Sequence, residues 1–170
     1  LKDEASLSRA KMTKIDLSNV VNSVVEDFNS NLLNSNKNIK IHINHSNLNG
    51  SKLNVLGVES KLEQIIANLL DNAVSFSPSN SNISIMCGIK KKEAQLIIKD
   101  EGPGFSEKNI DKVFNRFYSN RPEKFGEHSG LGLNIVRNLV EVHGGSIIAS
   151  NRTSGKGAKV DINFPQLLVN

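Results

Sequence analysis

Two hydrophobic periodicities alternate along the chain, and this alternation restricts the possible folds more than any other feature of the sequence. Apolar residues recur at helical spacing in three stretches, residues 17–28, 59–75 and 131–143. They recur with the character of strands in six shorter stretches, residues 39–43, 53–58, 83–89, 94–99, 146–150 and 159–164. The pattern predicts an α/β two-layer sandwich, in which about three helices cover one face of a mixed, mostly antiparallel sheet.

Local signals set the ends of these elements. Asp16 can cap the first helix, and the Asn- and Ser-rich residues 29–38 end it. Pro78 stops the second helix, and Gly144–Gly145 ends the third. We expect the lysines at 90–92 to form a solvated hairpin turn between two strands.

Composition excludes several classes of protein. The chain has 170 residues, 38% of them hydrophobic and 22% charged, which suits one soluble domain with a short extra segment. Its net charge of +4 permits an anionic ligand, but no aromatic residues alternate with Lys90–Lys92, so we expect no nucleic-acid partner. The single Cys87 cannot form a disulfide within the chain and is expected in the core.

The first residues indicate that the chain belongs to a longer protein. It begins with Leu1 rather than Met, and no leader-like segment follows. We expect residues 1–14 to be the end of an upstream helix with a linker, the linker occupying residues 11–14. Residues 15–170 are expected to form the main domain.

Two asparagines on the second predicted helix are candidate ligands. Asn68 and Asn72 are four residues apart, so both amides project from one face, beside the apolar stripe. Amide oxygens are hard neutral ligands that suit Mg²⁺ when phosphates also hold it. Taken alone, however, the pair is better explained as two tolerated surface amides.

Two glycine-bearing segments are candidates for nucleotide contact. Asp100 follows a strand and can accept a hydrogen bond from an exocyclic amine such as that of adenine, while Gly102 and Gly104 let the backbone approach a ligand. A simple tight turn explains this segment too.

Residues 129–133, Ser-Gly-Leu-Gly-Leu, open the third helix, where free N–H groups can hold phosphate oxygens. Each glycine in a helical turn costs about 1 kcal/mol relative to alanine. Two such glycines imply a reason for their presence, such as a ligand close to the backbone.

The order and spacing of these motifs resemble those of the catalytic, ATP-binding domain of sensor histidine kinases. Residues 68–73 resemble the N box, 100–104 the G1 box, 114–118 the F box and 129–133 the G2 box. Residues 142–147 are similar to the stretch that follows the G2 box, and the resemblance covers residues 16–165. It implies the Bergerat fold shared by DNA gyrase and histidine kinases. Residues 117–122 with the G2 box look most like the envelope-sensing kinases of alphaproteobacteria.

The resemblance implies a role for each motif. The implied ATP-binding residues are Asn68, Asn72, Asp100, Gly102, Gly104, Phe105, Ser129, Gly130, Leu131, Gly132 and Leu133. Asn72, helped by Asn68, would hold Mg²⁺ on the phosphates, and Asp100 would read the adenine amine. Arg116 would approach the phosphates and complete a catalytic set with the two asparagines. Residues 119–129 would form a mobile lid.

Three positions depart from the family pattern. Ser75 stands where the N box usually has a basic residue that reaches a phosphate, so this contact is missing or comes from Arg116, Arg121 or Lys124. His128 replaces a glycine of the fuller G2 pattern. Ala158 replaces a hydroxyl residue that follows the last glycine pair.

Asn68 also bears on which ATP chemistry is possible. Gyrase-type ATPases have a glutamate at this position, which activates water, and an amide cannot accept a proton usefully, so we expect poor hydrolysis. Transfer to an imidazole needs no such base, because a neutral histidine is already a nucleophile. None of His42, His45, His128 and His143 has the family's acceptor setting, and His143 is expected to be structural.

The resemblance therefore implies the ATP-binding catalytic domain of a two-component sensor histidine kinase. It would transfer the γ-phosphoryl group of Mg²⁺-ATP to a histidine in an upstream dimerisation domain that is absent from this chain. Implied partners are that domain and a response regulator receiver domain, with a homodimeric full-length protein and a monomeric isolated fragment. The expected location is the cytoplasmic portion of an inner-membrane sensor protein. Two alternatives stay open: a degenerate module that binds ATP without catalysis, and a serine kinase of the anti-sigma type.

Overall fold

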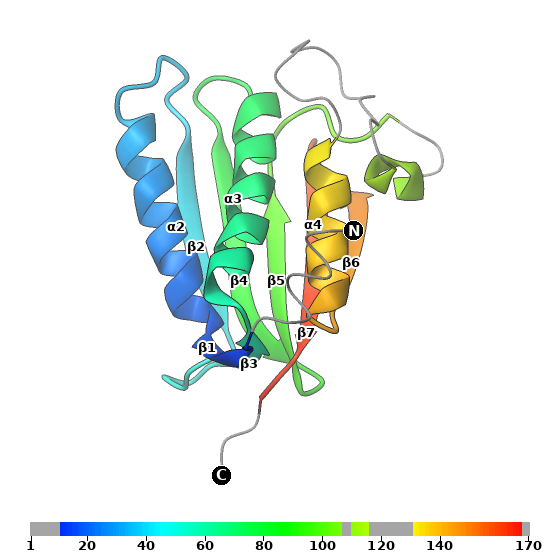
Figure 1. Cartoon of the computed structure of the whole chain (residues 1–170). Helices are drawn as coiled ribbons and strands as arrows, with labels where there is room; N and C mark the ends of the chain where they lie inside the picture. The colour runs from blue at the N-terminus through cyan, green and yellow to red at the C-terminus, as the bar shows by residue number, and fades with distance from the viewer. Residues whose placement is uncertain (1–10, 107–109, 116–130, 168–170) are drawn as a thin grey trace.

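Two layers make up the described part of the chain, a sheet and a row of helices that cover one of its faces (Figure 1). The computed structural model describes residues 11–106, 110–115 and 131–167. Within these ranges the α-helices are α2 (Leu17–Leu32), α3 (Glu59–Phe76) and α4 (Leu131–Val142). The expected α/β two-layer sandwich is confirmed. None of the helices in the described ranges combines the length and apolar character needed to cross a membrane.

The main sheet is mixed and mostly antiparallel, as the sequence predicts. Its strands, in spatial order, are β2 (Lys40–Ser46), β4 (Asn82–Lys90), β5 (Glu93–Lys99), β7 (Ala158–Pro165) and β6 (Ser146–Asn151). β2 runs parallel to β4, and every other neighbouring pair is antiparallel. The parallel pair is possible because β3 and α3 lie between β2 and β4 in the chain and provide a long crossover.

A separate two-stranded ribbon lies at one end of the sandwich (Figure 1). β1 (Thr13–Asp16) pairs antiparallel with β3 (Asn54–Gly57), with Thr13 opposite Gly57. Residues 11–14, expected to be a linker, therefore contribute two residues to a strand. A strand of four residues gives almost no periodic signal, and its partner lies far along the chain.

Asp16 caps α2, as predicted. Its Oδ1 atom accepts hydrogen bonds from the backbone nitrogen of Ser18 at 3.2 Å and from the Ser18 hydroxyl at 2.7 Å. α2 continues beyond Asn29, where the sequence predicts its end. The Asn29 amide exchanges two hydrogen bonds of 3.2 Å with the backbone of Ile41 on β2. This tertiary contact compensates for the poor helix propensity of the segment.

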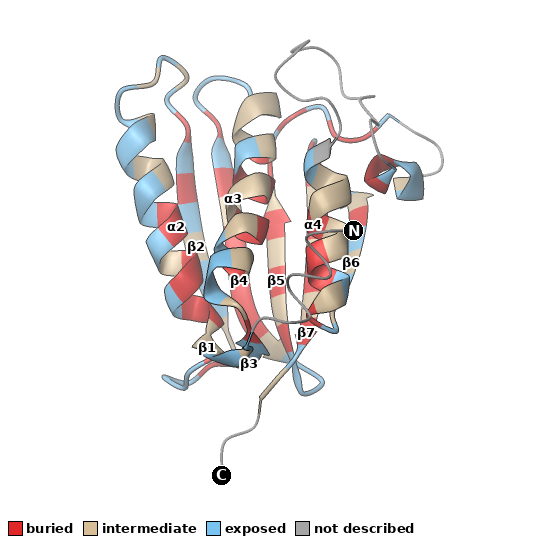
Figure 2. Ribbon diagram, in the orientation of Figure 1, coloured by how far each residue is buried: buried red, intermediate tan, exposed pale blue. Residues whose placement is uncertain are grey.

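The core lies between the helices and the sheet (Figure 2). Its largest fully buried side chains are Leu17, Leu53, Leu62, Ile65, Ile66, Leu70, Ile83, Ile85, Leu96, Ile162 and Phe164. Cys87 is also fully buried, and burial raises the pKa of its thiol to about 12, with the negative charge of Asp16 adding to the effect. A smaller cluster joins a short 3-10 helix, η1 (Ile110–Phe114), to β6 and the start of β7.

Candidate nucleotide-binding site

The predicted motifs converge at one end of the sandwich. The C-terminal end of α3, the end of β5 and the start of α4 lie near one another at the top of Figure 1. The turn between β4 and β5 and the β1–β3 ribbon lie at the opposite end. The fold therefore brings together the ends of three elements that carry the predicted motifs and lie far apart in the sequence.

Asn68 and Asn72 lie on α3 at the border between core and solvent. Both side chains are half-buried, whereas Leu69, Leu70 and Ala73 between and beside them are buried. No hydrogen bond joins either amide to another residue in the described ranges. The two side chains are one helical turn apart on the same side, so their oxygens can act on one ligand.

Asp100 is a buried carboxylate at the end of β5, with 4% of its surface exposed. Its Oδ1 atom accepts hydrogen bonds from the backbone nitrogens of Gly102 at 2.9 Å and Ala158 at 3.1 Å. Its own backbone nitrogen donates to the carbonyl oxygen of Ala158 at 3.1 Å. The two backbone amides thus hold the carboxylate in a fixed orientation.

The loop after Asp100 requires glycine at two positions. A Cβ atom at Gly102 would lie 2.6 Å from the carbonyl oxygen of Phe76, the last residue of α3. Gly104 has a φ of +79°, and a Cβ atom there would lie 2.6 Å from Oδ1 of Asn151. The glycines therefore let this loop pack directly against α3 and β6. Phe105, which follows them, is 5% exposed and packs in the smaller cluster.

Two residues of this site escape prediction from the sequence. The Asn151 side chain accepts from the Phe105 nitrogen at 2.7 Å and donates to the Phe105 carbonyl at 3.0 Å, so it holds the loop as a strand partner would. Arg152 donates through Nη1 to the carbonyl oxygen of Asp100 at 3.1 Å. Asn151 ends β6 and Arg152 follows it, about 50 residues after Asp100 in the chain, and no sequence signal marks either residue.

The third motif is described only in part. Arg116, Ser129 and Gly130, together with the expected lid of residues 119–129, lie outside the described residues. Leu131 begins α4, as predicted, and Gly132 is exposed, with no described atom within 4 Å of a Cβ placed there. Packing within the described residues therefore gives no reason for a glycine at this position.

Leu133 and Phe114 support the same end of the domain. Leu133 is half-buried and packs against both clusters. Phe114, from the predicted F box, is 3% exposed, and the Arg137 guanidinium lies 5.6 Å from its ring centroid. These contacts hold the Phe114 side chain in place at the start of the F-box motif.

His143 is structural, as expected. It is 7% exposed at the end of α4. Its Nδ1 atom lies 2.8 Å from the carbonyl oxygen of Leu139, and its Nε2 atom accepts from the backbone nitrogen of Val58 at 3.2 Å. Both ring nitrogens are therefore engaged with the backbone, and the imidazole ties α4 to the start of α3.

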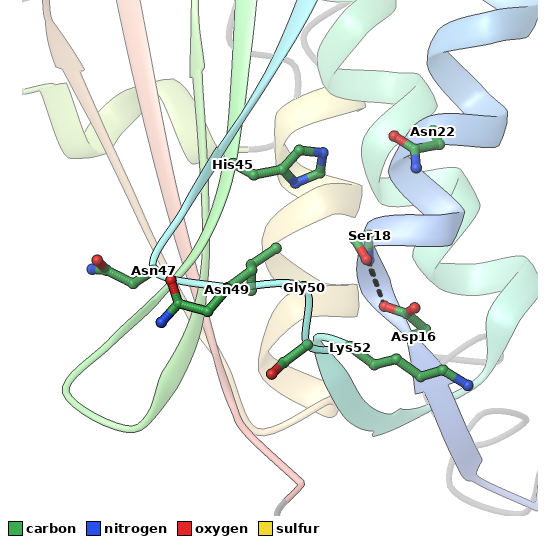
Figure 3. Close-up of a pocket in the computed structure, with 10 residues that line it drawn as sticks. Asp16, Ser18, Asn22, His45, Asn47, Asn49, Gly50 and Lys52 are labelled. Atoms are coloured by element: carbon green, nitrogen blue, oxygen red, sulfur yellow. Dashed lines mark hydrogen bonds between the residues drawn. The ribbon is translucent and has the colours of Figure 1, made fainter.

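A surface pocket of about 510 Å³ lies at the end of the sandwich opposite these motifs (Figure 3). It is formed around the N-terminus of α2 and the loop after β2, and Asp16, His45 and Lys52 are among its lining residues. None of the predicted site residues lines this pocket. It plays no part in the candidate nucleotide site.

Comparison with known families agrees with this geometry. A family model described as the histidine kinase-, DNA gyrase B- and HSP90-like ATPase matches residues 57–168. The chain belongs to this family. The matched range contains α3 with both asparagines, the Asp100 loop and α4.

Relatives and solved structures of this ATPase family extend the match over most of the chain. Sensor protein ChvG of Rhizobium meliloti (strain 1021) is 35% identical over 162 residues, which are 92% of this chain and 28% of ChvG. ChvG of Agrobacterium fabrum (strain C58) is 35% identical over 171 residues, 95% of this chain and 28% of that protein. The mycobacterial sensor histidine kinase MprB superposes with a TM-score of 0.79 at 25% identity, over 92% of this chain and 100% of that one.

The similarity to ChvG, an alphaproteobacterial kinase, agrees with the expected group within the ATPase family. The chain spans only 28% of the length of these curated relatives. It therefore corresponds to one part of such proteins. Ala158, where the family pattern has a hydroxyl residue, is 3% exposed. Its backbone nitrogen donates to the Asp100 carboxylate, and its carbonyl oxygen accepts from the Asp100 nitrogen.

Proposed function

We propose that the chain is the ATP-binding catalytic domain of a two-component sensor histidine kinase, which transfers the γ-phosphoryl group of ATP to a histidine outside this chain. The observation that carries the proposal is the buried Asp100 carboxylate, held by two backbone amides at the end of β5 and close to α3. A fixed carboxylate in this position suits recognition of an adenine amine. Family membership over residues 57–168 supports the same assignment.

Mg²⁺ and the phosphates fit the residues on α3. Asn68 and Asn72 are half-buried on one side of the helix, with no hydrogen-bond partners in the described ranges, and neutral amide oxygens suit a hard cation shared with phosphates. When bound, Mg²⁺ would neutralise phosphate charge. No described atom lies within 4 Å of a Cβ placed at Gly132, at the start of α4, where helix N–H groups can meet phosphate oxygens. A solved structure of ShkA, similar in fold, is a complex with AMPPNP, which supports nucleotide binding by this fold.

The proposed role of Asp100 is tested by base selectivity. ATP presents an amine to the carboxylate, whereas GTP presents a carbonyl oxygen, and a buried acceptor penalises that mismatch strongly. Calorimetry with non-hydrolysable analogues should show clear preference for adenine. Equal affinity for the two bases would refute this role for Asp100.

Asn72→Ala should remove most of the Mg²⁺ dependence of binding while leaving the fold intact.

Transfer to histidine, rather than hydrolysis, is favoured by Asn68. Its position corresponds to the water-activating glutamate of gyrase-type ATPases, and an amide cannot act as that base. We expect the domain to phosphorylate a separately supplied dimerisation domain from the same full-length protein, and the product to be acid-labile. Nucleotide binding without any transfer would favour the degenerate module instead, and an acid-stable product would favour a serine kinase.

The proposal extends to partners and location. The upstream dimerisation domain would supply the acceptor, and a response regulator would receive the phosphoryl group. A solved structure of ThkA, similar in fold, is a complex with the response regulator protein TrrA. Residues 1–14 would connect to the dimerisation domain, and the domain would act on the cytoplasmic side of a membrane-bound homodimer. Light scattering of the isolated chain should show a monomer.

A further inference from the structure

The C-terminal end of α3 is held by a lysine from another part of the chain. The Nζ atom of Lys37, between α2 and β2, donates to the backbone oxygens of Val74, Ser75 and Ser77 at 3.1, 3.0 and 3.1 Å. The side chain of Lys37 is half-buried. The last carbonyl groups of a helix have no partners within it, so this ammonium group supplies a cap from outside.

The cap also carries charge. α3 has no basic residue in its last turn, and the carbonyl end of a helix carries about half a negative charge. Ser75, at the position where the family pattern has a basic residue, supplies no cation of its own. The ammonium of Lys37 is hydrogen-bonded to the carbonyl of this same residue.

The loop that carries Lys37 is itself fixed. The Lys37 carbonyl accepts from the Asn80 nitrogen at 2.7 Å, and the Lys37 nitrogen donates to the Ser35 hydroxyl at 3.1 Å. The Asn38 side chain donates to that of Asn80 at 2.9 Å. The loop before β2 and the loop after α3 are thus joined, which presents the ammonium group to α3 in a set position.

The capped end of α3 adjoins the candidate nucleotide site. The Phe76 carbonyl is in direct contact with the Gly102 backbone, as the 2.6 Å approach of a Cβ placed there indicates. Ser75 follows Asn72 by three residues, which is about 4.5 Å along a helix axis. The charge of Lys37 therefore lies about one turn beyond the predicted Mg²⁺ ligand.

We propose that Lys37 is a positioning residue for the nucleotide phosphates. Its charge offsets the negative end of α3 beside the phosphates, and so takes the place of the basic side chain that Ser75 does not supply. This inference rests on the proposed ATP-binding function. Without the charge, the phosphates face an uncompensated helix end, and the loss of affinity grows with the number of phosphate charges.

The test compares nucleotides that differ only in phosphate number. Affinities for AMP, ADP and an ATP analogue would be measured by calorimetry for wild type, Lys37→Gln and Lys37→Arg, with thermal melts of each. Glutamine keeps N–H groups that can donate to carbonyls but removes the charge, and arginine keeps the charge. Lys37→Gln should weaken the ATP analogue about fivefold and AMP less than about twofold, an effect that shrinks in high salt. Lys37→Arg should stay within about twofold of wild type for all three.

Lys40→Gln is the matched control, because Lys40 is an exposed lysine three residues away whose backbone, not its side chain, bonds Ser81. It should leave all affinities unchanged. If Lys37→Gln does not fold, Asn36→Asp adds a negative charge on an exposed neighbour and should likewise weaken the ATP analogue more than AMP. Equal losses for AMP and the ATP analogue, or a lower melting temperature with unchanged affinities, would overturn the inference. Failure of the wild type to bind any nucleotide would refute the proposed function instead.

Discussion

Replacing Asp100 separates the structural role of its carboxylate from its role in binding. Asp100→Ala leaves two buried N–H groups, those of Gly102 and Ala158, without their acceptor. Each unsatisfied buried donor costs about 1–3 kcal/mol, so the free energy of unfolding should fall by about 2–6 kcal/mol. Asp100→Asn keeps an oxygen that can accept both of these bonds, and these bonds lose only their strengthening by charge, so their weakening should cost no more than about 2 kcal/mol.

Urea unfolding followed by circular dichroism measures both losses, provided that the dependence on denaturant stays the same for all three proteins. Nucleotide calorimetry on the same samples supplies the second readout. Asp100→Asn should remain well folded yet bind the ATP analogue much more weakly, because its amide can present a donor to the adenine amine. Equal destabilisation by the two substitutions would refute the argument from unsatisfied amides. Unchanged binding by a folded Asp100→Asn would refute the adenine contact.

Single side chains of the core and of the site support three further predictions. His143→Ala should lower the free energy of unfolding by about 2–4 kcal/mol in urea, because it leaves the Val58 amide without an acceptor and opens space in the core. Asn151→Ala should speed hydrogen exchange at the Phe105 amide without unfolding the domain; unchanged exchange would mean that other groups hold this loop. Cys87 has a folded-state pKa of about 12, raised from 9.0, so the native state keeps a proton that the unfolded state releases. Stability should therefore fall by about 1.4 kcal/mol per pH unit between those two values, and Cys87→Ala should remove this part of the slope.

Helix positions were predictable because their signals are local. The Asp16 cap, the apolar stripe of α3 and the glycines after α4 each mark an end or a face within a few residues. Local pattern predicts the end of α2 too early, because the Asn29 amide bonds the backbone of Ile41, a contact that no local pattern contains. The same holds for β1, which pairs with β3, far along the chain.

Strand order and the supports of the site depend on contacts between distant residues. Nothing in the periodicity shows that β2 pairs parallel with β4, or that β7 lies between β5 and β6. For the site, the spacing of Asn68, Asn72 and Asp100 could be compared with a family pattern. Lys37 and Asn151 could not, because each acts on backbone groups whose proximity only the fold creates.

The arrangement of α3 explains how one helix can serve both the core and a nucleotide site. Its apolar stripe, including Leu62 and Ile66, is buried against the sheet, while Asn68 and Asn72 lie at the border of that stripe. A substitution of either amide removes no buried apolar surface, so it should alter ligand binding with little effect on folding. The two ends of the helix are fixed by groups from elsewhere: His143 bonds the residue before its first turn, and Lys37 caps its last. The geometry of the asparagines is therefore set by the fold as a whole, and the charge at the end of the helix can be changed independently of the ligands on its side.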